Sequence, residues 1–296
     1  MKSGVVILNK EAGMTSHTAV RRVSALLGAQ KAGHTGTLDP MAEGVLPVLI
    51  NRGVKASEFM LSEDKHYRAT LTLGVTTDTE DSSGTVLTEC RDIPPRDAVL
   101  SAISSSVGEI MQTPPMYSAL KVGGRKLCDL AREGVSVERQ ARRITVYSID
   151  ATEIDERNYM LDVHCSKGTY IRTLCADIGA SLGVGGIMSS LLRTEASGFT
   201  LDTAHTLAEI EAMSEDERAA LVYPVEYVFR DYNAIKLPAF FERLARAGLE
   251  IYLKKIGVSA QPGDRFTLLG EGGEFFAVGE VREFEDGLAV KPIRQF

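Results

Sequence analysis

The sequence predicts an α+β fold, in which a large domain has a mixed or antiparallel sheet with flanking helices and a small β-rich domain follows. Strand and helix patterns alternate through the first 200 residues. Residues 206–230 have an acidic, helical pattern, and from Gln261 onward short apolar segments are separated by glycines. We therefore predict one domain over residues 1–230 and a second over residues 231–296.

The first predicted elements lie before residue 75. Residues 5–8 form a short apolar run, which is typical of a buried strand. A helix is predicted to begin at Thr15 or Ser16 and to end at Gly28. Residues 67–73 alternate between apolar and polar side chains, which indicates a half-buried strand.

The later elements follow the same patterns. In the large domain we predict a polar, acidic loop over 76–84, helices over 96–106, 126–132 and 170–182, and paired strands over 144–154 and 159–165. In the small domain we predict a helix from Pro238 to Gly248 and strands over 266–269, 275–281 and 288–293.

The composition excludes several classes of protein. Of 296 residues, 44% are hydrophobic and 25% are charged, and the longest apolar runs are far too short to span a bilayer. The four cysteines show neither CxxC pairs nor zinc-ligand spacing, and the N-terminus lacks the organisation of a signal peptide. We expect a cytoplasmic protein with reduced thiols, no metal and no membrane contact.

The charges are distributed unevenly. The net charge is −7, yet residues 1–60 carry seven Lys and Arg against four acids, and residues 121–150 carry the same numbers. Residues 200–231 carry eight acids against two arginines. An acidic protein can thus present a basic face to nucleic acid, while its acidic total predicts recognition of RNA through shape and a defined pocket.

The segment with the most functional information is Gly33-His-Thr-Gly-Thr-Leu-Asp39-Pro-Met-Ala-Glu-Gly44-Val-Leu-Pro47. Its glycines allow positive φ or a close approach of the backbone to another group. Pro40 biases Asp39 away from helical conformation, so Asp39 is expected on an extended or turned backbone. For an isolated Asp-Pro pair, a simple turn would be the preferred interpretation.

The order of residues in this segment resembles the signature of the TruB-type tRNA pseudouridine synthases. The resemblance implies the pseudouridine synthase catalytic domain, and the segments around Gly263, Val278 and Val290 resemble more loosely the PUA-like RNA-binding module that follows it. In that family the aspartate of the signature is the nucleophile, which here is Asp39. The resemblance covers most of residues 4–200.

A nucleophilic carboxylate in a dry pocket needs a counter-charge, because burial raises a carboxyl pKa and a guanidinium lowers it. The candidate is Arg172 in Lys167-Gly-Thr-Tyr-Ile-Arg172, which resembles the second motif of the family. By that resemblance Arg172 pairs with Asp39 and Tyr170 lines the uridine pocket. Tyr67 matches the tyrosine that stacks on the flipped base, although a strand tyrosine alone more often indicates packing.

Further matches extend the resemblance. His34 corresponds to the histidine that contacts the T-loop and helps displace the target nucleotide. Lys10 belongs to an Asn-Lys element that shapes the site, with Glu11 in place of the usual proline. Leu191 is implied to cap the uracil, and the arginine of the same element, Arg193, to approach RNA. Asp78 matches an acidic position beside the pocket.

The resulting prediction is an enzyme without cofactor or metal that converts uridine 55 in the T-loop of tRNA to pseudouridine, by base flipping and an aspartate nucleophile. Asp39 could add to C6 of the uracil or act at the ribose, and the sequence leaves both routes open. The expected partner is the T-arm of tRNA, with no obligate protein partner.

Three alternative functions fit the sequence less well. A guide-RNA-dependent homologue that modifies rRNA usually carries lysine-rich extensions, and none is found here. An RNA-binding or tRNA-chaperone module without catalysis is disfavoured by the presence of Asp39, Tyr67 and Arg172. A glycosidase needs two carboxylates in one cleft, and only Glu43 lies near Asp39 in the sequence.

Overall fold

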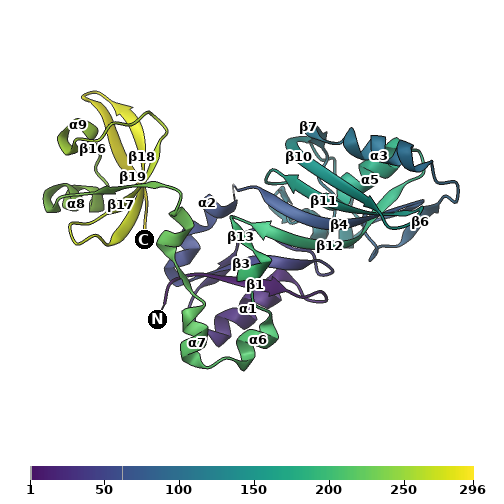
Figure 1. Ribbon diagram of the computed structural model, residues 1–296, viewed down its shortest axis with the longest axis horizontal. Coiled ribbons are helices and arrows are strands. Elements are labelled where there is room, and N and C mark those ends of the chain that lie inside the picture. Colours follow the sequence, from purple (N-terminus) through teal and green to yellow (C-terminus); the bar gives the residue numbers. More distant parts are fainter. Residues whose placement is uncertain (1, 62) are drawn as a thin grey trace.

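The computed structural model describes residues 2–61 and 63–296, and it has two parts, each built on its own sheet (Figure 1). The larger sheet has the strand order β14-β1-β3-β12-β4-β11-β10-β7, with β13 paired to β12 and β2 to β3. Its strands are β1 (Gly4–Lys10), β2 (Ala32–His34), β3 (Glu43–Ile50), β4 (Lys65–Leu73), β7 (Gly108–Gln112), β10 (Arg142–Glu153), β11 (Asn158–Cys165), β12 (Gly186–Ala196), β13 (Phe199–Thr200) and β14 (Tyr223–Pro224). The sheet is mixed, because β12 pairs antiparallel with β4 and parallel with β3.

Helices cover this sheet and close its core. Thr15 caps α1 (Ser16–Leu26) by accepting a hydrogen bond from the Thr18 N–H, and the helix buries Ala19, Val20 and Val23. The core also takes apolar side chains from α3 (Arg96–Ser104), α5 (Ile171–Ser181) and α6 (Leu207–Ala212). The other helical segments are η1 (Asn51–Ala56), α2 (Ser57–Leu61), α4 (Leu127–Arg132), η2 (Leu201–Thr203), α7 (Glu215–Ala220) and η3 (Val225–Phe229).

Two small hairpins extend from the larger part. They are β5 (Val75–Thr77) with β6 (Val86–Glu89), and β8 (Lys121–Val122) with β9 (Arg125–Lys126). The first hairpin carries the acidic loop that the sequence predicts after residue 76.

The smaller part is a sheet of order β15-β17-β18-β19-β16. Its elements are β15 (Asn233–Lys236), α8 (Ala239–Arg246), β16 (Ile251–Tyr252), α9 (Leu253–Ile256), β17 (Arg265–Leu269), β18 (Phe275–Phe284) and β19 (Gly287–Gln295). It has its own apolar core and lies at one end of the elongated molecule (Figure 1). Contacts to the larger part include Phe229 against Phe275 and an ion pair between Arg294 and Glu58.

The predicted α+β class is correct, and most predicted elements are present. Residues 206–230 are mostly helical as expected, but β14 interrupts them. The main omissions are β3 and β12, to which the sequence patterns assigned no strand although both lie inside the sheet. The boundary at residue 230 stays a prediction. Within the described residues, no helix is both long and apolar enough to cross a membrane.

Candidate active site

The loop that carries Asp39 connects β2 to β3 and is held by three side chains, those of Ser16, Lys10 and Arg193. Ser16 at the start of α1 bonds to both backbone groups of Leu38 at 2.9 Å. The buried ammonium of Lys10 donates to the carbonyls of Ala42 and Pro40 at 2.6 and 3.3 Å. These contacts fix the backbone on both sides of the carboxylate without using the carboxylate itself.

Glycines are needed at one position in the loop and at one position at the start of β3. Gly36 and Gly44 have φ values of 84° and 104°, which side-chain-bearing residues rarely adopt. A Cβ on Gly44 would also lie 2.2 Å from the carbonyl oxygen of Arg193. By contrast, Gly33 lies in β2 with open space around it and no positive φ, so neither reason expected for a glycine applies there.

Asp39 and Arg172 form the ion pair that the sequence predicts. Nε of Arg172 lies 2.9 Å from Oδ2 of Asp39, and Nη2 lies 3.5 Å from Oδ1. Arg172 stands in the first turn of α5, and its guanidinium also donates to the carbonyls of Thr79 and Tyr117 at 2.9 and 2.7 Å. The arginine is therefore fixed, and its position fixes the carboxylate.

The environment of Asp39 affects its pKa in opposite directions. Burial raises the pKa of the carboxyl, the Arg172 guanidinium lowers it, and the net direction is upward from 3.8. The counter-charge thus opposes desolvation without fully cancelling it. The Asp39 side chain keeps 33% of its surface exposed, so an incoming ligand can reach it.

The second carboxylate at Arg172 is Asp81, which the sequence interpretation missed. Its Oδ2 lies 3.7 Å from Nη1 of Arg172, and Asp81 is buried. Asp78, the predicted acidic residue, is exposed and accepts a hydrogen bond from the Thr85 N–H in its own loop. The prediction of Asp78 is corrected here, because the hairpin turns Asp81 inward and Asp78 outward.

Tyr67 and Leu191 lie on neighbouring strands of the same sheet. In the antiparallel pair of β4 and β12, Tyr67 faces Arg193 and Ala69 faces Leu191, so the two predicted residues share one face. Tyr67 and Leu191 are each 8% exposed and belong to the same apolar cluster. Burial raises the pKa of Tyr67, and the Asp39 charge acts in the same direction.

Tyr170 precedes α5, two residues before Arg172. Its backbone N–H donates to Gln112 Oε1 at 2.8 Å, and its carbonyl accepts from Gln112 Nε2 at 3.0 Å. This buried amide on β7 holds the start of the helix in place. Burial raises the pKa of the Tyr170 phenol, with a further contribution from Asp39.

His34 lies at the end of β2, next to the loop. Its Nδ1 is buried, and within the part of the chain that the structure describes no group bonds to it. Burial and the positive charge of Arg193 both lower the pKa of His34, so the ring is neutral near pH 7. The ring as a whole is partly exposed, and a neutral, flat imidazole suits contact with RNA bases.

Arg193 does not approach RNA as the resemblance implied. It is 1% exposed, and its Nε donates to the Val45 carbonyl at 2.7 Å. The expectation fails because Arg193 lies on the buried face of β12, the strand that sequence patterns did not reveal. Period-two alternation gave no clear signal for this burial, because the residues two positions away are Leu191 and Glu195.

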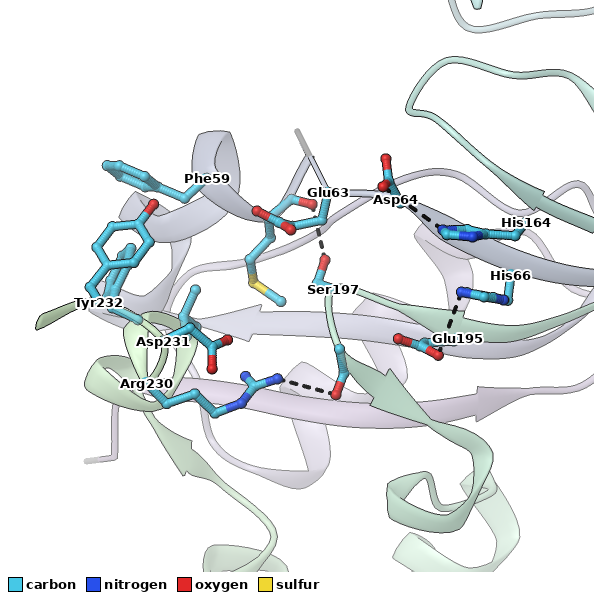
Figure 2. Close-up of a pocket in the computed structure, with 14 residues that line it drawn as sticks. Phe59, Glu63, Asp64, His66, His164, Glu195, Ser197, Arg230, Asp231 and Tyr232 are labelled. Carbon is cyan, nitrogen blue, oxygen red and sulfur yellow. Dashed lines mark hydrogen bonds and ion pairs between the residues drawn. The ribbon is translucent and has the colours of Figure 1, made fainter. Parts of the chain in front are cut away.

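A cleft of about 370 Å³ lies elsewhere, between the ends of β4, β11 and β12 and the segment that follows η3 (Figure 2). The rings of His66 and His164 stack there with centroids 4.0 Å apart, next to Glu195 and Asp64. None of the sequence-predicted site residues lines it. Over residues 2–61 and 63–296, no group of His, Cys, Asp and Glu has an arrangement that could hold a metal ion.

Comparisons with known proteins agree with this geometry. Residues 24–171 match the N-terminal domain of the TruB family pseudouridylate synthases, and residues 172–230 match the C-terminal domain of tRNA pseudouridylate synthase B. The tRNA pseudouridine synthase B of Alkaliphilus oremlandii is 46% identical over 250 residues, which are 84% of this chain and 83% of that protein. That of Aromatoleum aromaticum is 39% identical over 277 residues, 94% and 88% of the two chains.

A solved structure shares the fold. A chain in the crystal structure of a Cbf5-Nop10-Gar1 complex aligns with a TM-score of 0.72 and 27% identity, over 99% of this chain and 84% of that one. A structure titled as an H/ACA RNP bound to a substrate RNA aligns with a TM-score of 0.71 and 26% identity, with the same shares of the two chains covered. Together with the Asp39–Arg172 pair, these matches establish that the chain belongs to the TruB family of pseudouridylate synthases.

Proposed function

We propose that this protein isomerises uridine 55 in the T-loop of tRNA to pseudouridine, with Asp39 as the nucleophile. The observation that carries the proposal is the 2.9 Å ion pair between Asp39 and the buried Arg172, on a loop held by three side chains. The names of the relatives support tRNA as the substrate. No cofactor or protein partner is needed for the reaction that we assign.

The chemistry requires only rearrangement of the substrate's own atoms. The bond from the ribose C1′ to N1 breaks, a bond from C1′ to C5 forms, C5 loses a proton and N1 gains one. Asp39 supplies the carboxylate, and Arg172 holds it in its ionised form. Tyr67 stacks on the extruded base, with a contribution of about 1–3 kcal/mol by analogy with other base–aromatic contacts.

The remaining residues shape the pocket. Tyr170 and Leu191 line it, and Lys10 acts through the loop backbone and not through the substrate. His34 fills the position that the flipped nucleotide leaves. We further propose that residues 231–296 are a separate RNA-binding module of PUA-like type, which is supported by their independent sheet and core. We also propose that the enzyme acts in the cytoplasm.

The test uses an unmodified tRNA transcript, the pure protein and mapping of pseudouridine at single-nucleotide resolution. Pseudouridine is expected at position 55, and none in a transcript with cytidine at that position. Asp39→Asn should abolish the product. Asp97→Asn is the matched control, because its side chain is 97% exposed on α3. No product with the wild type, or full activity in Asp39→Asn, would contradict the proposal.

A second function is guide-RNA-dependent modification of rRNA. One observation favours it: the fold is shared with chains of a Cbf5-Nop10-Gar1 complex and of an H/ACA RNP. The same experiment separates the two functions, since the transcript is offered without guide RNA or other proteins. Product formed under those conditions excludes a requirement for a guide. Product formed only after addition of a guide RNA would favour the second function.

A further inference from the structure

Arg193 is a fully buried arginine that links the two sides of the proposed active site. From β12 its Nε donates to the carbonyl of Val45 at 2.7 Å, and its Nη2 donates to the carbonyl of Gly36 at 3.1 Å. These carbonyls lie on either side of Asp39 in the sequence. One side chain therefore bridges the two ends of the Asp39 loop.

The charge of Arg193 has no acidic partner within the described residues, where no carboxylate lies within ion-pair distance of it. Two of its neighbours are the buried cations Lys10 and Lys65, and the charge of Arg193 lowers the pKa of each. Keeping such a charge out of water without a counter-ion costs several kcal/mol in general. A neutral donor could bridge two carbonyls at lower cost, so bridging alone does not account for a charged side chain at this position.

Tyr67 is the group through which this charge can act. It stands directly opposite Arg193 in the β4–β12 register, and the Arg193 guanidinium lowers the pKa of its phenol against the larger effect of burial. Because burial raises the pKa of Tyr67, the phenol keeps its proton and can itself donate a hydrogen bond. A positive charge beside the phenol makes it a stronger donor, since that charge stabilises the negative charge that builds up on the oxygen as the proton is shared.

We propose that Arg193 is a positioning residue that acts through Tyr67, holding its ring against the Asp39 loop and placing a positive charge behind it to stabilise negative charge on the uracil ring. This proposal rests on the proposed function. When the C1′–N1 bond breaks, its electron pair moves into the uracil ring and spreads over N1 and the carbonyl oxygens. A fixed positive potential in a water-excluded site lowers the energy of that state.

The test is a double-mutant cycle with Arg193→Met, Tyr67→Phe and the double variant. For each protein, kcat and KM are measured on the unmodified tRNA transcript. Arg193→Met should lower kcat about 100-fold, the scale of losing one preorganised charge-stabilising donor, with little change in KM. In the Tyr67→Phe background the same substitution should cost far less. Arg193→Lys keeps the charge and should retain more activity than Arg193→Met.

The matched control is Arg157→Met, a partly buried arginine that donates to the Cys90 carbonyl away from the loop, and it should leave kcat unchanged. Additive losses in kcat from Arg193→Met and Tyr67→Phe would overturn the proposal. An equal loss in Arg193→Lys and Arg193→Met would overturn the role of the charge.

A second measurement, the urea unfolding of the same four proteins, reads the Arg193–Tyr67 coupling without activity. The coupling is supported if the double variant loses less unfolding free energy than the two single variants lose in sum. Additive losses reject it. If Arg193→Met does not fold, the cycle is completed with Arg193→Lys. A wild type that makes no pseudouridine overturns the proposed function, and the unfolding cycle still decides whether the two side chains are coupled.

Discussion

Nε of Arg172 lies 2.9 Å from Oδ2 of Asp39, across a separation of 133 positions in the chain. The pair joins the first turn of α5 to a loop between β2 and β3. Because Arg172 is 4% exposed and also bonded to two carbonyls, it keeps its position whether or not the carboxylate is charged. This relationship leads directly to a prediction on pH dependence.

Removing the guanidinium should shift the acid limb of the activity profile to higher pH. Asp39 acts as the carboxylate, so activity falls as pH drops through its pKa, which already lies above 3.8. Without Arg172 that pKa should rise by about 1–3 units. The check is kcat/KM from pH 4 to 9 for wild type, Arg172→Met and Arg172→Lys, measured by tritium release from C5. An unshifted acid limb in Arg172→Met would show that the pair does not set the ionisation of Asp39.

The lowered pKa of Lys10 leads us to expect that the stability of the protein changes in alkaline solution. Desolvation lowers the pKa of Lys10 from 10.5 to about 8, against the attraction of Asp39. The unfolded state therefore holds more protons between these values, and the free energy of unfolding should rise with pH across this window. The gain relative to Lys10→Met should be at most about 3 kcal/mol, from 1.36 kcal/mol per pKa unit.

The measurement for Lys10 is urea unfolding of both proteins at pH 7, 8, 9 and 10. The difference between wild type and Lys10→Met isolates the lysine, because every other titrating group is shared. A difference that is constant with pH would refute the lowered pKa.

We expect that substitution of Gly44 causes a large loss of stability. In Gly44→Ala the new Cβ would meet the Arg193 carbonyl at 2.2 Å, and the backbone is strained at φ 104°. We expect about 2–4 kcal/mol of destabilisation, from the clash added to a strained φ. Gly134→Ala is the control, since Gly134 has φ 74° but open space and should lose only about 1–2 kcal/mol. Equal losses of stability in the two variants would show that the close approach of β3 to β12 adds nothing to the cost of a side chain at position 44.

The four cysteines fall into two classes by burial, and we expect the two classes to differ in reactivity. Burial raises the pKa of Cys165 to about 11 and that of Cys175 to about 12, whereas Cys90 and Cys128 are partly exposed. In native protein at pH 8, a chromogenic disulfide reagent should titrate Cys90 and Cys128 rapidly, and the other two only after unfolding. Fast reaction of all four thiols would contradict this burial.

Much of the fold follows from local patterns in the chain. The cap at Thr15, the alternation along β4 and the breaks at glycines all act over a few residues, and α1, α5 and the C-terminal strands lie where these patterns predict them. The strand β12 was not predicted, because its pattern includes a fully buried arginine and its partners β3 and β4 are distant in sequence. Sheet order depends on contacts of that range.

By itself, the sequence determined the loop of Asp39, since Pro40 and the glycines restrict its backbone. It also showed that a buried carboxylate there needs a counter-charge, for which the family resemblance named Arg172. Only the tertiary structure decided that Asp81 and not Asp78 lies at that arginine, and that Arg193 is buried behind Tyr67 instead of facing RNA. The physical reason is that φ preferences and periodicity are local. Which of several like charges turns inward depends on hydrogen-bond donors for a carboxylate, or acceptors for a guanidinium, supplied by elements far away in the chain.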